Sequence, residues 1–219
     1  MFLKVLSWAE AWAVVFPIVT FLTKKQTAKP LRIVFLYLCI AILLHTWADL
    51  SVVFYYQLSG FLKHNNWVYN LHSITITVCF ISFFQSVSLK SKWLNARRSI
   101  PVFLFIVAVI FLFIDDFFLV SSKLFAVEGL FLLTYCMAFF LQRLKEDEVY
   151  LDFDPYLVIV IGLSIYESTN FFIFLFYNVL MTSAVSFAVL IWNVHNVVYI
   201  IFCLFITYAF YGRTRFLYS

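Results

Sequence analysis

The sequence predicts an all-α protein, a single bundle of seven transmembrane helices that takes up residues 1–219 as one domain. Of the 219 residues, 65% are hydrophobic and only 12% are charged, whereas soluble domains carry about 25% charged residues. The apolar residues also form seven separate stretches, each close to the roughly 20 residues that cross a bilayer. The lipid bilayer is therefore the expected surroundings of nearly the whole chain.

The seven helices are predicted from these uninterrupted apolar stretches in chain order. They are expected near residues 5–23, 31–56, 67–88, 100–120, 124–142, 156–177 and 184–211. The link between the fourth and fifth helices is short, so these two helices are expected to be antiparallel neighbours.

Local signals support several of the predicted helix starts. The first stretch contains Glu10 and its basic residues follow it, which is typical of a transmembrane helix and not of a cleaved signal peptide. Pro30, Pro101 and Pro155 are expected near the starts of the second, fourth and sixth helices, where a missing N–H costs nothing. Asp154 is expected to cap the sixth helix.

The distribution of Lys and Arg predicts the orientation. Twelve of the 15 basic residues fall on one side of the predicted spans, and only Lys4, Lys63 and Lys123 fall on the other. The positive-inside rule places the basic side in the cytoplasm. This predicts an outer N-terminus and a cytoplasmic C-terminus, and we expect the protein in the cytoplasmic (inner) membrane of a bacterium. The twelve are Lys24, Lys25, Lys29, Arg32, Lys90, Lys92, Arg97, Arg98, Arg143, Lys145, Arg213 and Arg215.

The acidic residues indicate where function is expected. Five of the eleven fall in the loop between the fifth and sixth helices, and the other six fall within predicted spans. A carboxylate near the centre of a membrane helix costs about 2.5–3.5 kcal/mol on insertion scales, so such residues are candidates for a functional site. The six are Glu10, Asp49, Asp115, Asp116, Glu128 and Glu167.

Helical spacing predicts that polar side chains converge in the outer half of the bundle. His45 and Asp49 are four residues apart on one helix, close enough for the carboxylate to orient the imidazole. At 1.5 Å per residue, two groups of polar residues are expected at different depths. About 5–10 Å below the outer surface lie Glu10, Asp49, His72, Asp115, Asp116 and Glu128, and about 15 Å below it lie His45, Glu167, Asn170, His195 and Asn196. The predicted ligand pocket, open to the outside, comprises Glu10, His45, Asp49, His72, Glu128, Glu167, Asn170, Asn193, His195, Asn196 and Tyr199.

A metal site is one interpretation of the histidines. His45, His72 and His195 are candidate ligands for a divalent metal such as zinc, which would activate water for Glu167 as a general base. In composition these residues resemble the seven-helix zinc hydrolases, such as the alkaline ceramidases and adiponectin-receptor-like proteins. That family carries HxxxH in its seventh helix, whereas here Tyr199 stands in the second histidine position.

Two other resemblances bear on function. Rhodopsins share the seven helices and the outer N-terminus, but residues 191–211 contain no lysine to bind retinal, so no retinal is expected. The stretches 69–74 and 191–196 resemble those of uncharacterised small seven-helix bacterial membrane proteins. That resemblance implies no activity.

Three functions are consistent with the sequence. The first is a receptor-like or sensory protein whose pocket binds a small ligand or ion and signals through a membrane partner protein. The second is a metal-dependent intramembrane hydrolase that acts on lipid, and the third is a proton or cation transporter. The third is weaker because the chain shows no internal repeat, and among the prolines only Pro17 lies inside a span. No nucleic-acid partner is expected, because the net charge of +4 comes from the basic loops.

Overall fold

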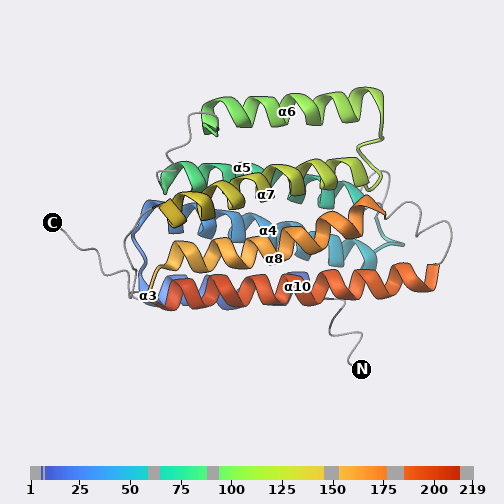
Figure 1. Cartoon of the computed structure of the whole chain (residues 1–219). Helices are drawn as coiled ribbons and strands as arrows, with labels where there is room; N and C mark the ends of the chain where they lie inside the picture. Colours follow the sequence, from blue (N-terminus) through green and yellow to red (C-terminus); the bar gives the residue numbers. More distant parts are fainter. Residues whose placement is uncertain are drawn as a thin grey trace.

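The computed structural model is a helical bundle that confirms the predicted fold class (Figure 1). It describes residues 6, 8–58, 65–87, 94–145, 153–176 and 185–212, and only the backbone of 185–189. Within these residues there is no strand, and six helices are long and apolar enough to cross a membrane. The protein is therefore an integral multi-pass membrane protein, and its orientation stays a prediction from the basic residues.

Each predicted span from the second to the seventh corresponds to one helix, and the first corresponds to two. The helices are α2 (Ala9–Trp12), α3 (Val15–Lys24), α4 (Lys29–Val53), α5 (Asn66–Ser86), α6 (Ala96–Phe113), α7 (Ser122–Lys145), α8 (Pro155–Leu175) and α10 (Val185–Tyr211).

The predicted first helix is interrupted at Ala13 and Val14, between α2 and α3. Pro17 has no N–H to donate to the carbonyl of Ala13, so the hydrogen-bond ladder lacks a bond at this point. The ladder continues on either side, from Ala13 N to Ala9 O at 2.9 Å and from Ile18 N to Val14 O at 3.3 Å. The short helix α2 before this missing bond carries Glu10.

Prolines were predicted near three helix starts, and two of these predictions are confirmed, as is the predicted N-cap. Pro30 lies in the first turn of α4 and Pro155 begins α8, where the side chain of Asp154 accepts hydrogen bonds from the backbone N–H groups of Tyr156 and Leu157. The expectation for Pro101 is wrong, because α6 begins at Ala96 and Pro101 lies inside it. The side chain of Asn95, five residues before the predicted start, caps α6 by accepting from the N–H of Arg97.

The predicted fourth helix also ends early, at Phe113. Asp115 and Asp116 were expected within a span, but both lie in the turn between α6 and α7. Asp115 pairs with Lys123 and accepts a hydrogen bond of 2.7 Å from Ser121. Partial burial raises the pKa of the Asp115 carboxyl, but these bonds from Lys123 and Ser121 outweigh it and hold the pKa below its usual range.

Asn70 of α5 fastens this turn to the bundle. Its amide nitrogen donates to the carbonyl oxygens of Phe117 and Leu119, at 2.8 and 2.7 Å, and its oxygen accepts from the N–H of Ser121 at 3.2 Å. The side chain is fully buried. Asn70 was not predicted to be important, because a single asparagine near a helix start is not part of any repeating polar pattern.

Replacing Asn70 by alanine is expected to lower the free energy of unfolding by about 2 kcal/mol, because three backbone groups of the turn lose their partner. Thermal unfolding of the purified protein in one detergent measures this. Asp116→Asn is the control, since Asp116 is exposed and only accepts from the backbone of Phe118 in the same turn. Equal stability of Asn70→Ala and wild type would show that the turn does not depend on Asn70.

Aromatic side chains fill the interior of the bundle toward one end. At this end, which is the predicted cytoplasmic end, α4, α6 and α8 begin. Phe80 packs against Phe83 and Phe202, each at 5.8 Å between ring centroids, and Phe84 stacks on Tyr135 at 5.3 Å. All five side chains are buried. The polar side chains described next therefore lie toward the opposite end, where α5, α7 and α10 begin.

Candidate functional site

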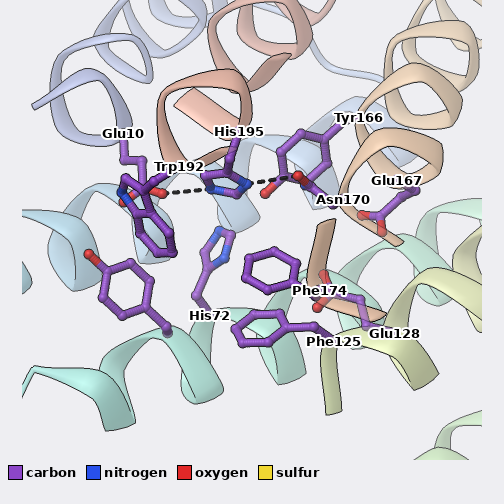
Figure 2. Close-up of a pocket in the computed structure, with 11 residues that line it drawn as sticks. Glu10, His72, Phe125, Glu128, Tyr166, Glu167, Asn170, Phe174, Trp192 and His195 are labelled. Atoms are coloured by element: carbon purple, nitrogen blue, oxygen red, sulfur yellow. Dashed lines mark hydrogen bonds and ion pairs between the residues drawn. The ribbon is translucent and has the colours of Figure 1, made fainter. Parts of the chain in front are cut away.

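A cavity lies between five helices, α2, α5, α7, α8 and α10, with polar and aromatic side chains directed into it (Figure 2). The volume of the cavity is about 20 Å³. No Lys or Arg is among the lining residues. They are Glu10, Tyr69, His72, Phe125, Glu128, Tyr166, Glu167, Asn170, Phe174, Trp192 and His195.

Glu10 lies between two histidines from distant parts of the chain. Its Oε1 is 2.8 Å from Nε2 of His195, and its Oε2 is 3.3 Å from Nδ1 of His45. The first contact has hydrogen-bond geometry, whereas the second is close enough for an ion pair but points away from the hydrogen-bond direction. The carboxyl group therefore joins α2 to both α4 and α10.

His195 is held through both ring nitrogens. Its Nδ1 is 2.8 Å from Oδ1 of Asn170, and its Nε2 contacts Glu10 (Figure 2). The carboxylate of Glu10 accepts from an N–H at Nε2, and the Asn170 amide faces Nδ1. The ring also lies 5.3 Å from that of Trp192 and 5.6 Å from that of Phe174. Glu10 and His195 thus form a buried carboxyl–imidazole pair.

His72 and His45 lie side by side next to this pair. Their ring centroids are 4.5 Å apart, and Nε2 of His72 is 3.1 Å from the hydroxyl of Tyr37. Both histidines are buried. The Tyr199 ring lies 5.6 Å from that of His45 and 6.3 Å from that of His72. Tyr37 and Tyr199 therefore separate the two histidines from the aromatic side chains that fill the other end of the bundle.

Glu128 and Glu167 line the other side of the cavity, on the adjacent helices α7 and α8 (Figure 2). They are 5% and 2% exposed. Oε1 of Glu167 has no hydrogen-bond partner among the described residues. The two carboxyl groups interact electrostatically with each other, and neither is paired with a cation within the described part of the chain.

Six of the eleven predicted pocket residues line the cavity: Glu10, His72, Glu128, Glu167, Asn170 and His195. Glu10, which its sequence position places nearer to the surface, contacts the deeper His45 and His195.

The other predicted pocket residues lie around the cavity and not on its wall. His45 and Tyr199 pack behind His72, and Asn193 is half-buried. Asn196 donates to the backbone carbonyl of Leu6 at 3.1 Å, which ties the N-terminal segment to α10. Asp49 is half-buried, and the predicted contact with His45 does not form in the described chain, because that imidazole turns to Glu10.

The described residues do not form the predicted zinc site. No three His, Cys, Asp or Glu side chains among them are arranged to hold a metal ion. Both ring nitrogens of His195 are engaged, and Nε2 of His72 contacts Tyr37. The hydrolase interpretation therefore gains no support from the described residues.

Most of the aromatic lining of the cavity was not predicted from the sequence. Trp192 lies three residues before His195 on the polar face of its helix, and Tyr69, Phe125, Tyr166 and Phe174 also line the cavity. The chain contains 29 Phe and 13 Tyr, and a ring on the cavity wall has the same pattern as a ring in the core. For Tyr166 and Phe174, the spacing of four residues from Asn170 is a signal that distinguishes them from core residues.

Comparison with known proteins gives no relative. No family model, no curated protein and no solved structure matches the chain.

Proposed function

We propose that this protein is a receptor-like membrane protein whose intramembrane cavity binds a proton or one small inorganic cation. The observation that carries the proposal is the pair Glu128 and Glu167, two buried carboxyl groups on one cavity with no Lys or Arg in its lining. The carboxyl group of Glu10, by contrast, has two histidines beside it as partners. Two further negative charges in a low-dielectric interior require neutralisation, by a proton or by a cation.

The size of the cavity supports an ion over an organic ligand. Pockets for drug-sized ligands have about 300–1,000 Å³, whereas a single water needs about 10–15 Å³ of space for its centre. The cavity here has about 20 Å³. The sequence predicted a small ligand or an ion. Of these, a proton, or a cation with at most one water, fits a cavity of this size.

The packing favours a receptor over a transporter. A transporter needs a second polar route to the opposite surface, but the interior toward the basic end is filled by buried aromatic rings such as Phe80, Phe83 and Phe202. The cavity also joins five helices. A ligand that binds one arrangement of these helices more tightly shifts the population toward it, and a membrane partner protein would detect that arrangement.

The test is thermal unfolding of the protein in lipid nanodiscs across pH 5–8, with NaCl or KCl replaced by choline chloride at constant ionic strength. A bound ligand stabilises the folded state by mass action, about 1.4 kcal/mol for each tenfold rise in free ligand above its Kd. We expect the melting temperature to depend on pH alone if a proton binds. We expect it to depend on Na⁺ or K⁺ concentration at fixed pH if a cation binds.

Glu167→Gln is the informative variant, because the amide keeps the shape of the side chain but cannot ionise. We expect this substitution to remove the dependence on pH or cation. Asp116→Asn is the matched control, since it also removes one carboxyl group, and Asp116 is exposed in the turn after α6. A wild-type response that persists unchanged in Glu167→Gln would contradict the proposal.

A further inference from the structure

Helix α6 lies at the edge of the bundle and leaves a groove along α7. It contacts α5 and α7 and stands apart from the other helices (Figure 1). Its outer face is apolar and exposed, with Phe105 69% and Leu112 74% accessible. Two adjoining hollows of about 230 and 420 Å³ lie between the start of α6 and the outer face of α7. Together they form one groove, which we call the α6–α7 groove.

The lining of the α6–α7 groove is almost entirely apolar. Leu94, Leu130 and Thr134 line both hollows, and the hydroxyl of Thr134 donates to the carbonyl of Leu130, so it offers no free donor. The remaining lining residues are Ser99, Phe131, Leu133, Tyr135, Met137, Ala138 and Leu141. A surface of this kind within a membrane accommodates hydrocarbon and not a polar ligand.

The length of the groove corresponds to one lipid leaflet. At 1.5 Å per residue, the stretch of α7 from Leu130 to Leu141 is about 16 Å long. The hydrocarbon core of a bilayer is about 30 Å thick, so one leaflet is about half of that. Leu141 lies four residues before the end of α7 at Lys145. The groove therefore extends from near the middle of the membrane to one surface.

Basic residues lie at the surface end of the groove. Arg97 and Arg98 are exposed in the first turn of α6, and the next residue, Ser99, lines the groove. Neither guanidinium forms an ion pair with any residue in the described segments. Lys145 ends α7 on the same side of the bundle. The exposed guanidinium groups are therefore available to an anionic group at this end of the groove.

From the apolar groove of one-leaflet length and the two arginines at its end, we infer that an anionic phospholipid binds here. One acyl chain lies along α7 in the α6–α7 groove, and the phosphate contacts Arg97 and Arg98 at the start of α6. The two parts have different roles. The groove selects a chain in the leaflet at the basic end, and the arginines select an anionic headgroup over a zwitterionic one.

Native mass spectrometry of the full chain, released from membranes of equal phosphatidylglycerol and phosphatidylethanolamine, tests this inference. We expect about one retained phosphatidylglycerol per protein. Arg97→Gln with Arg98→Gln is expected to weaken its retention roughly tenfold. Lys25→Gln with Lys29→Gln is the matched control, because it removes the same charge from exposed residues at another link on this end of the bundle.

A second pair of variants tests the groove itself. Thr134→Trp places a large ring in the groove and is expected to reduce retention of both lipids, whereas Leu204→Trp places the same ring on an exposed face of α10 and is expected to leave it unchanged. Circular dichroism confirms that each variant is folded. Equal retention of the two lipids by the wild type, or full retention by the double arginine variant, would overturn the inference.

Discussion

Replacing Glu10 by leucine is expected to lower the free energy of unfolding by about 3 kcal/mol, the largest effect of any single change in the polar cluster. The variant leaves His195 with a ring proton that has lost its carboxylate, and it removes the charge beside His45. Removing one partner of a buried ion pair leaves the other charge uncompensated in a low-dielectric interior. Thermal or denaturant unfolding, followed by loss of helicity, measures the effect.

Asp49→Leu is the control, because helical spacing predicts a different carboxylate partner for His45 than the structure shows. Asp49 and His45 are four residues apart on α4, and spacing alone assigns this carboxylate as the partner of His45. In the structure Asp49 is half-buried and that imidazole faces Glu10. We therefore expect Asp49→Leu to change the free energy of unfolding by less than about 0.5 kcal/mol. The reverse order of the two effects would show that the α2 segment does not enter the bundle as described.

Gly162→Leu is expected to destabilise the protein by about 3 kcal/mol through overpacking between α8 and α10. A Cβ atom at Gly162 would lie 2.6 Å from Cβ and 2.9 Å from Cγ of Phe205, closer than two carbon atoms approach. Small residues allow membrane helices to pack closely, and this contact is between the two helices that carry Glu167 and His195. Unfolding in a fixed detergent measures the loss of stability.

The double variant Gly162→Leu with Phe205→Gly identifies the cause. Removing the whole side chain of Phe205, its Cβ included, gives the new side chain room, so the double variant is expected to be more stable than Gly162→Leu alone, although Phe205→Gly by itself destabilises. If the two changes are simply additive, the destabilisation does not arise from the contact between residues 162 and 205.

The sequence predicted the helices well where a local rule applies. Six apolar stretches are continuous helices because each backbone satisfies its own hydrogen bonds in lipid, whatever surrounds it. Asp154 caps α8 because an N-cap bond involves only neighbouring residues. The end of α6 at Phe113 was not predictable in this way, since Asn70, 43 residues earlier, holds the following turn.

The candidate site was determined partly by composition and partly by packing. Composition alone marked Glu128, Glu167 and His195 as buried and unusual, because an ionisable group within an apolar stretch has a cost wherever the helix lies. Only the tertiary structure decided that Glu10, and not Asp49, faces His45 and His195. Periodicity determines which side chains share a helix face, but which faces meet depends on the packing of all the helices together.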